Sequence, residues 1–409
     1  MTQKTTIAVL GAGIFGSALA WRLAARGICP GAEILVIDPN PPAAQASSRA
    51  AALLSLSRPA AKSHWIPLVR QTLAAVETLA AQGIDVPAHR CGALHLADSP
   101  AVRDVLADHA ATADAHGLNY ERRNPASCAA LLPWLDMARF SEALWFPDEG
   151  YTDPYLLASA YAAAARKLGV RFRCGTPAAL ATDGRQACVD LPEGRIHPET
   201  VWVAAGAWSG RVLRPLGLAA PQAAVRSQYW ITGNTPLVPP AMPMVLAADL
   251  RLYARPEVGA ILFGLREDAG MAVSSDQLPD DLAGFQFDPA DPEGHATLEA
   301  FAGRLAHYAP GLMATGLRHY ITGPSCYTPD GDFLVGHLAD WDNLGLLAGC
   351  NGAGIAASAG LADLAADCIA GLSPAGLERF DPARFGRVEA DAPEWRARCI
   401  AARAGKTSG

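Results

Sequence analysis

The sequence predicts an α/β fold in which a doubly wound, Rossmann-like domain carries an inserted domain built on a mixed, largely antiparallel β-sheet. Three observations predict this architecture. A strand–turn–helix–strand unit opens the chain, short alternating segments separated by proline-rich turns occupy residues 228–264, and a buried strand and a helix return at 344–370. A chain of 409 residues also suits two domains better than a single core.

The opening unit has the pattern of a βαβ motif. Residues 6–10 are an apolar run rich in strand formers, and residues 17–25 favour a helix that Gly27 ends. Residues 33–37 then form a second buried strand, which ends at Asp38 and is followed by a proline-rich break. The segment between the first strand and the helix is therefore the place to look for a ligand.

A glycine-rich turn fills that segment, with Gly11, Gly13 and Gly16 in the dinucleotide-binding spacing. The first glycine permits a tight turn, the second lets the backbone approach a pyrophosphate, and the third allows close helix packing. The helix N-terminus presents N–H groups and partial positive charge to the anion. Asp38 can accept hydrogen bonds from ribose hydroxyls and disfavours a 2′-phosphate, so the ligand is either NAD or FAD.

The remaining elements complete a discontinuous two-domain arrangement. Periodicity predicts helices at 60–81, 101–116, 155–168, 293–308 and 354–370, and strands at 170–173, 200–204, 228–231, 252–255, 261–265, 318–322 and 344–348. We expect a cofactor domain at 1–84, 145–220 and 323–375, a substrate domain at 85–144 and 221–322, and a tail at 376–409. The chain after Gly371 is expected to be loosely held.

Composition limits the possible partners and the compartment. A net charge of −7, with no cluster of lysines and arginines, argues against nucleic acid. Nine scattered cysteines without a two-residue pair indicate reduced thiols, a cytoplasmic protein and no metal site. No apolar run is long enough to be a transmembrane segment.

Four further segments decide between NAD and FAD. They are residues 46–52 (Ala-Ser-Ser-Arg-Ala-Ala-Ala), 200–209 (Thr-Val-Trp-Val-Ala-Ala-Gly-Ala-Trp-Ser), 323–331 (Gly-Pro-Ser-Cys-Tyr-Thr-Pro-Asp-Gly) and 347–355 (Leu-Ala-Gly-Cys-Asn-Gly-Ala-Gly-Ile). With the glycine turn, they resemble the D-amino-acid oxidase-type family of FAD enzymes, which includes glycine and sarcosine oxidases and dimethylglycine and D-arginine dehydrogenases. The resemblance spans nearly the whole chain in the same order.

The resemblance implies a role for each matching position. The pyrophosphate would lie on Gly11, Gly13, Ile14, Phe15 and Gly16, the ribose on Asp38, and the adenine on the backbone of Ala178. Ser47, Ser48 and Ala51 would run along the flavin, with Arg49 available to a phosphate, and Ala205, Gly206 and Trp208 would line the cofactor. Asn351, Gly352, Ala353, Gly354 and Ile355 would reach the flavin ring, where N–H groups at a helix start stabilise negative charge.

Departures from the family pattern shape the expected chemistry. Ser325 and Ala356 stand where some members have an arginine and a lysine that hold the substrate carboxylate, so any such contact must come from elsewhere. The covalent flavin cysteine of other members would fall at Gly323, which leaves Cys326 out of register and predicts noncovalent FAD. Leu262 stands where sarcosine oxidases have an oxygen-activating lysine, which favours a dehydrogenase over an oxidase.

Three residues are candidates for contacting the substrate. Tyr253 matches a pocket tyrosine of several family members, and Tyr327 lies in a flavin-side motif; either can instead be an ordinary packed tyrosine. Arg266 is a candidate carboxylate anchor because its guanidinium binds carboxylates bidentately, and the alternative is a surface arginine beside Glu267 and Asp268.

Other polar residues have weaker claims on the pocket. Arg58, Lys62 and His64 can face its entrance, but each is better explained as a surface residue at a helix start. His319 and Tyr320 alternate on one strand, so at most one of them faces the site.

The family resemblance implies an oxidoreductase acting on an amino acid or N-alkyl amino acid. A hydride passes from the carbon next to nitrogen to flavin N5, the resulting imine is hydrolysed, and the electrons pass to oxygen or another acceptor. One alternative is an FAD-dependent 2-hydroxy acid dehydrogenase, which needs a base such as histidine. Another is the FAD-binding subunit of a heteromeric amine dehydrogenase, and both homo- and hetero-oligomers stay open.

Overall fold

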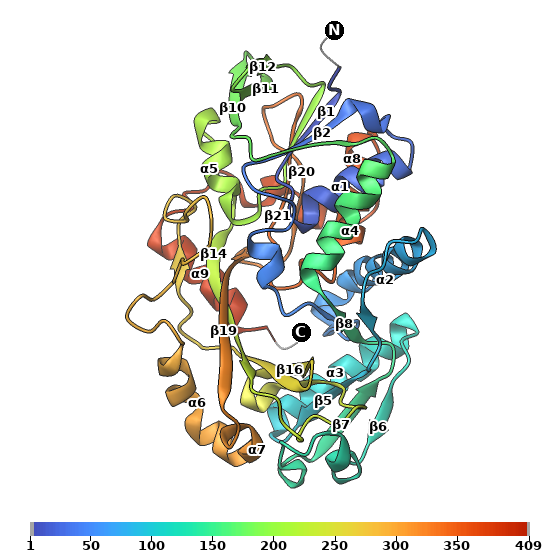
Figure 1. The fold of residues 1–409 in the computed structure, drawn as a ribbon, viewed down its shortest axis with the longest axis vertical. Coiled ribbons are helices and arrows are strands. Elements are labelled where there is room, and N and C mark those ends of the chain that lie inside the picture. Colours follow the sequence, from blue (N-terminus) through green and yellow to red (C-terminus); the bar gives the residue numbers. More distant parts are fainter. Residues whose placement is uncertain (1–3, 407–409) are drawn as a thin grey trace.

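A six-stranded sheet forms one half of the molecule (Figure 1). The computed structural model describes residues 4–406. Five strands are parallel and the edge strand β20 is antiparallel. In spatial order they are β20 (Leu334–His337), β21 (Leu344–Ala348), β13 (Thr200–Val203), β1 (Ile7–Leu10), β2 (Ile34–Asp38) and β9 (Arg171–Cys174).

Helices cover one face of this sheet and a small meander covers the other. The helices are α1 (Ile14–Ala25), α2 (Ile66–Ala81), α4 (Pro154–Lys167) and α8 (Ser358–Ile369), which pack on one another. Trp21 of α1 stacks on Tyr161 of α4 with ring centroids 5.4 Å apart, and Arg22 pairs with Asp363 of α8. The meander is β10 (Ala179–Asp183), β11 (Gln186–Leu191) and β12 (Gly194–Ile196), whose Leu180 and Val189 share a core with β1.

A nine-stranded sheet forms the other half. Its strand pairs are antiparallel except for β5 with β15, so the predicted mixed, largely antiparallel sheet is confirmed. Helices α3 (Pro100–His116), α6 (His295–Tyr308) and α7 (Pro310–Met313) lie beside it (Figure 1). The strands are β5 (Ala93–Ala97), β6 (Glu121–Arg123), β7 (Glu142–Phe146), β14 (Ala223–Thr232), β15 (Met244–Ala247), β16 (Leu252–Glu257), β17 (Ala260–Leu265), β18 (Ala272–Val273) and β19 (Leu317–Tyr327).

A buried carboxylate lies where a third sheet joins the two halves. This sheet consists of β3 (Leu53–Leu54), β4 (Ala88–His89) and β8 (Gly150–Thr152). Glu149, just before β8, is fully buried and accepts hydrogen bonds from Ser55 Oγ at 3.0 Å and from the N–H groups of Leu56 and Ser57 at 2.8 and 2.5 Å. His95 Nε2 of β5 lies 3.3 Å away. One side chain thus links the loop after β3 to the nine-stranded sheet.

The structure corrects three expectations about element boundaries. The strand expected at 318–322 runs to Tyr327, because β19 pairs with β14 along almost its entire length. The helix expected from residue 354 begins at Ser358, since residues 351–357 form turns. The expectation of a loosely held tail is wrong for its described part, because α9 (Pro393–Ala404) packs Trp395 and Cys399 against β14 and β19.

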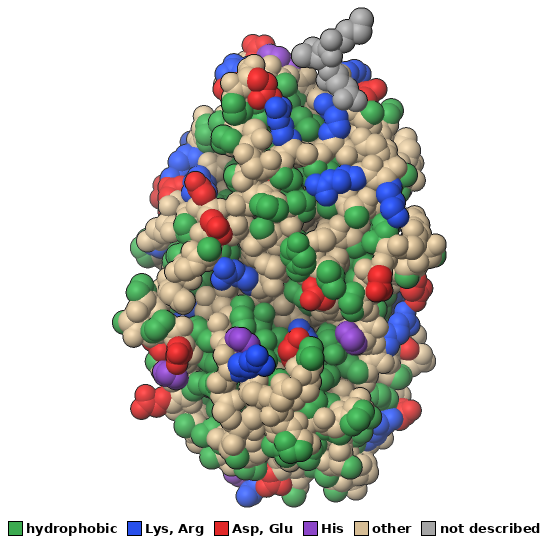
Figure 2. Space-filling view, viewed as in Figure 1, with side chains coloured by type: hydrophobic (Ala, Val, Ile, Leu, Met, Phe, Trp, Pro, Cys, Tyr) green, Lys and Arg blue, Asp and Glu red, His purple; other side chains and the backbone are tan. Residues whose placement is uncertain are grey.

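The surface carries charges of both signs. On the face drawn in Figure 2, acidic and basic side chains are interspersed rather than gathered in a field of one sign. No helix within residues 4–406 is long and apolar enough to cross a membrane.

Candidate functional site

One cavity connects most of the motifs singled out in the sequence. It opens at the carboxyl ends of β1, β2 and β13, which is where open α/β sheets bind ligands. At its other end it reaches β16, β17 and β19 of the nine-stranded sheet. The predicted residues that line it are Gly11, Gly13, Ile14, Phe15, Asp38, Ser47, Arg49, Ala51, Ala178, Ala205, Gly206, Trp208, Tyr253, Arg266, Tyr327, Gly352, Ala353, Gly354 and Ile355.

The glycine turn has the geometry that a pyrophosphate requires. Gly11 has a φ of +115°, and a Cβ there would lie 2.5 Å from the carbonyl oxygen of Ala204, so only glycine fits. Gly16 lies outside the cavity lining and lets α1 approach Gly11, as the sequence predicts. Gly13 is the N-cap of α1 and has no side chain to accept from its first turn. The Ile14 N–H donates to Ser47 Oγ at 3.0 Å, and the helix start beside this cavity still has the geometry to receive the diphosphate of FAD.

Asp38 lines the cavity at the end of β2, where the family resemblance predicts the ribose. Its Oδ2 accepts from the Ala12 N–H at 2.7 Å and its Oδ1 from the Asn40 N–H at 2.7 Å. Burial raises the pKa of this carboxyl above the usual range, while the two N–H groups oppose the rise. The carboxylate is thus held in a fixed orientation at the end of β2.

Replacing Asp38 by alanine is expected to raise the Kd for FAD by about 10- to 100-fold. The reason is that the variant loses a charge-assisted acceptor for the ribose, worth about 1.5–3 kcal/mol, and leaves the Ala12 N–H unpaired. Titration of the apoprotein with FAD measures the change. Asp183→Ala, on an exposed position of β10, is the control. Equal FAD affinity in the Asp38 variant would contradict the ribose assignment.

Three predicted cofactor residues have structural contacts instead. Ser48 donates to the carbonyl of Gln45, outside the cavity lining. Arg49 lines the cavity but donates to the carbonyls of Thr322 and Leu282, so it braces the loop. Asn351 is buried behind the cavity and its side chain accepts from the Thr328 N–H at 3.1 Å.

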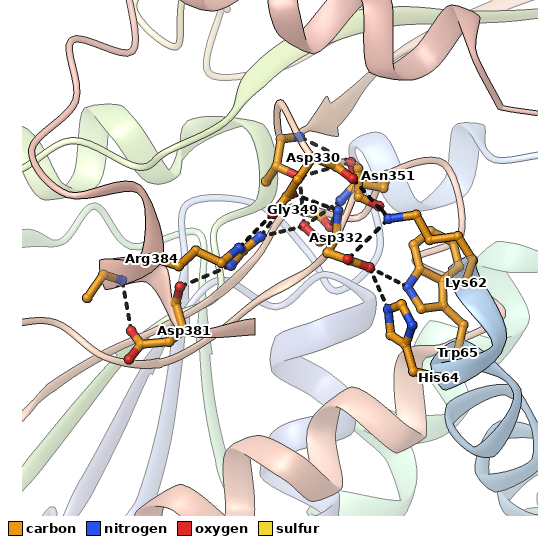
Figure 3. A network of polar contacts seen from close by, with 12 residues as sticks. Lys62, His64, Trp65, Asp330, Asp332, Gly349, Asn351, Asp381 and Arg384 are labelled. Carbon is orange, nitrogen blue, oxygen red and sulfur yellow. Dashed lines mark hydrogen bonds and ion pairs between the residues drawn. The ribbon is translucent and has the colours of Figure 1, made fainter. Parts of the chain in front are cut away.

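A polar network links residues 62–65 to the chain around Asp332 and Asn351 (Figure 3). The Asp332 carboxylate forms hydrogen bonds with His64 Nε2 at 2.7 Å and Trp65 Nε1 at 2.8 Å. It also forms an ion pair with Lys62 Nζ at 3.1 Å. Burial works against these contacts, yet together they lower the pKa of Asp332 to about 2. Asn351 Nδ2 donates to the Asp332 carbonyl at 2.9 Å, and its Oδ1 accepts from the Thr328 N–H, which joins the segment 323–331 to the segment 347–355. Lys62 and His64 therefore belong to this network and not to the pocket entrance.

The prediction that Arg58 lies on the surface is wrong. Its side chain is fully buried, and Nη1 donates to the carbonyl of Ser57 at 2.9 Å. Burial lowers the pKa of Arg58 to about 10. Of the two residues on β19, His319 is exposed, and Tyr320 donates to Gln228 Oε1 at 2.7 Å; neither lines the cavity.

The end of the cavity at β16 and β19 brings together the three candidates for contacting a substrate, Tyr253, Arg266 and Tyr327. The guanidinium carbon of Arg266 lies 5.4 Å from the ring centroid of Tyr253, whose hydroxyl donates to the Gln228 carbonyl at 3.2 Å. Burial raises the pKa of Tyr253 to about 12, so both it and Tyr327 keep their protons at neutral pH. Arg266 is not the surface arginine that the alternative interpretation predicted, because it lines the cavity.

Two cationic residues of the C-terminal tail, Arg403 and Lys406, also line this end of the cavity, and the sequence analysis did not predict them. Arg403 Nη2 pairs with Glu267 Oε2 at 3.0 Å, and Lys406 follows α9. Trp395, Cys399 and Arg403 are buried and spaced by four residues after Pro393. This spacing is typical of one face of a helix, and it could have predicted that the tail packs against the rest of the protein.

Comparison with known proteins now identifies the family. The family described as FAD dependent oxidoreductase matches residues 6–368. The chain belongs to this family. The predicted resemblance to a family of FAD enzymes is confirmed.

Two relatives show the same family along most of the chain. The chain is 27% identical over 382 residues to 4-methylaminobutanoate oxidase (formaldehyde-forming) of Paenarthrobacter nicotinovorans, covering 92% of this chain and 45% of the relative. It is 26% identical over 402 residues to mitochondrial dimethylglycine dehydrogenase of Mus musculus, covering 94% of this chain and 44% of the relative. The chain thus spans less than half the length of these relatives.

Solved structures of the FAD-dependent oxidoreductase fold agree with the architecture. Glycine oxidase from Geobacillus kaustophilus superposes with a TM-score of 0.74 at 23% identity, covering 95% of this chain and 99% of that one. L-proline dehydrogenase from P. horikoshii gives a TM-score of 0.79 at 20% identity, covering 94% and 98%. The predicted fold class is therefore confirmed.

Proposed function

We propose that the chain binds FAD noncovalently and oxidises the CH–NH bond of an amino acid or N-alkyl amino acid whose carboxylate is held by Arg266. The observation that supports this proposal is the single cavity that joins the glycine turn to Arg266, Tyr253 and Tyr327. A guanidinium in a partly buried, aromatic-lined site binds a carboxylate more tightly than it does in bulk water, because the effective dielectric constant is lower there.

The side chains at this end would orient the substrate. When bound, FAD supplies the two-electron acceptor chemistry, and the protein contributes position and charge. Arg266 would fix the carboxylate, and the neutral hydroxyls of Tyr253 and Tyr327 would limit rotation of the remaining substrate. No residue needs to act as a strong base, since an amine substrate that binds in its neutral form already carries the lone pair that drives imine formation.

The cavity lining counts against the 2-hydroxy acid alternative. Oxidation of a hydroxyl group requires a base close to it, and histidine is the usual choice. None of the described residues that line the cavity is a histidine. His95 and His109, both buried, lie outside this lining.

An anaerobic absorbance titration of the purified protein tests the proposal. The panel contains D-, L- and N-methyl amino acids with 2-hydroxy acids of matched length. Bleaching of a yellow protein by an amine supports the reaction class, and release of the flavin by acid denaturation supports noncovalent binding. A protein that takes up no FAD, or that is bleached only by hydroxy acids, would overturn the proposal. Reoxidation by air or by an artificial acceptor then separates an oxidase from a dehydrogenase.

A further inference from the structure

Two cysteines, Cys326 and Cys350, lie side by side in the wall of the cavity. Cys326 belongs to the end of β19, and Cys350 lies in the turn after β21. The Cys326 carbonyl accepts from the Asn351 N–H at 2.7 Å, so the two backbone segments are in direct contact. A disulfide requires such adjacency, because it spans only a short separation between Cα atoms. All nine cysteines are free thiols in the structure, so the pair is present in its reduced form.

Hydrogen-bond donors surround the sulfur of Cys350. Its Sγ accepts from the Cys326 N–H at 3.3 Å and lies 3.3 Å from Ser325 Oγ. The hydrogen bond from the Cys326 thiol lowers the pKa of Cys350 to about 6, while burial opposes the shift and Ser325 supports it. Donors directed at one sulfur stabilise its thiolate, which is the form that acts as a nucleophile.

The two thiols differ in their access to the cavity and in their charge. Cys350 is partly exposed, whereas Cys326 is buried. Its hydrogen bond to Cys350, followed by burial, raises the pKa of Cys326 well above the ordinary value, so Cys326 keeps its proton. Cys91 and Cys174 are also partly exposed, but burial raises the pKa of each. Only the first pair therefore combines an accessible thiolate with an adjacent thiol that can react with it.

We infer that Cys350 and Cys326 form a modification site for hydrogen peroxide, in which Cys350 is the attacking sulfur and Cys326 is the resolving one. The inference goes beyond the proposed function, since no step of amine oxidation uses either thiol. The resulting disulfide would join the end of β19 to the turn after β21, which are two segments of the cavity wall.

The modification takes place in two steps. In the first step, an S–O bond forms between Cys350 and one peroxide oxygen while the O–O bond breaks, so the sulfur loses two electrons and hydroxide leaves. In the second step, the sulfur of Cys326 displaces the oxygen from this sulfenic acid. The S–S bond forms, the S–O bond breaks, and the departing hydroxide takes the thiol proton of Cys326 to become water.

The alternative is that Cys350 stays a neutral thiol, donates to the Cys326 carbonyl at 3.5 Å and only packs there. The two accounts differ in which cysteine reacts, so the full-length protein, freed of flavin, is treated with hydrogen peroxide. Dimedone traps sulfenic acids, the remaining thiols are alkylated, and peptide mass spectrometry locates each product. The variants are Cys326→Ser, Cys350→Ser and the control Cys91→Ser, which removes a partly exposed thiol outside the pair.

The wild type is expected to form a disulfide between Cys326 and Cys350. At about pH 6.5, Cys350 is expected to react roughly tenfold faster than Cys91 or Cys174, since its larger thiolate fraction outweighs its lower intrinsic nucleophilicity. This comparison is made within the wild type and does not depend on the folding of a variant. Cys326→Ser should stop at the sulfenic acid of Cys350, Cys350→Ser should give neither product, and Cys91→Ser should form the disulfide as the wild type does.

Three results would overturn the inference. The first is a wild type that forms no disulfide between Cys326 and Cys350, and the second is equal reaction rates at Cys350 and Cys91. The third is a sulfenic acid on Cys326 in the Cys350→Ser variant, because it would assign the attack to the other sulfur.

Discussion

Arg266→Met is expected to lower kcat/KM for the amino acid substrate by roughly 30- to 1,000-fold, or about 2–4 kcal/mol. The reason is that the variant removes the bidentate cation from a site walled by Tyr253 and leaves the substrate carboxylate desolvated without its main partner. Methionine keeps much of the apolar stem, so packing against the tyrosine ring is largely retained. Steady-state kinetics with an artificial acceptor measure the change.

The kinetic pattern separates binding from structural damage. A rise in KM at constant kcat indicates an interaction made equally in the bound and transition states. Arg304→Met, at an exposed position of α6 outside the cavity, is the control and should behave like the wild type. An unchanged kcat/KM in Arg266→Met would show that the carboxylate is held elsewhere, whereas loss of bound FAD would indicate a structural role.

Glu149→Gln is expected to destabilise the fold by about 3–5 kcal/mol at neutral pH. Its carboxylate accepts from Ser55, Leu56, Ser57 and His95 in a fully buried position, so an amide would present donors where only acceptors fit. Urea unfolding followed by circular dichroism measures the loss. Glu299→Gln, exposed on α6, is the matched control and should change stability by less than about 0.5 kcal/mol.

The effect of Glu149 also has a defined pH dependence. Burial alone would raise the pKa of this carboxyl, but the hydrogen bond and charge of His95 outweigh it, with the Ser57 amide and Arg58 helping, and the pKa is lowered. A depressed folded-state pKa contributes stability above the unfolded pKa of about 4.3, and this contribution is lost as pH falls through the folded value. The stability gap between wild type and Glu149→Gln should therefore be widest near pH 7 and should shrink below about pH 4.3. A gap that stays constant with pH would contradict this account.

The parts of the fold that the sequence predicted are those set by local patterns. The turn Gly11–Gly16 and the strand ending at Asp38 need only near neighbours to be recognised, and the motifs at 200–209 and 347–355 occur in a recognisable order. Roles that depend on distant packing could not be read in this way. Whether Arg58 faces water or the interior depends on the elements that pack over it, and the position of Lys406 depends on α9 meeting β14. The bonds of the Asn351 side chain to Thr328 and Asp332 could not be predicted either, because they depend on how two distant segments pack.

The strand order has a consequence for the synthesis of the chain. β1 pairs with β2 and with β13, so residues 7–10 lack their second partner until residues 200–203 have been made. At about 5–20 residues per second, a ribosome takes roughly 10 to 40 seconds to cover that interval. The glycine turn of the nascent chain lacks one neighbour during this time, because the carbonyl of Ala204 that lies against Gly11 directly follows β13. Flavin is thus expected to be loaded only onto chains in which β13 has left the exit tunnel, which makes cofactor supply a late checkpoint on yield.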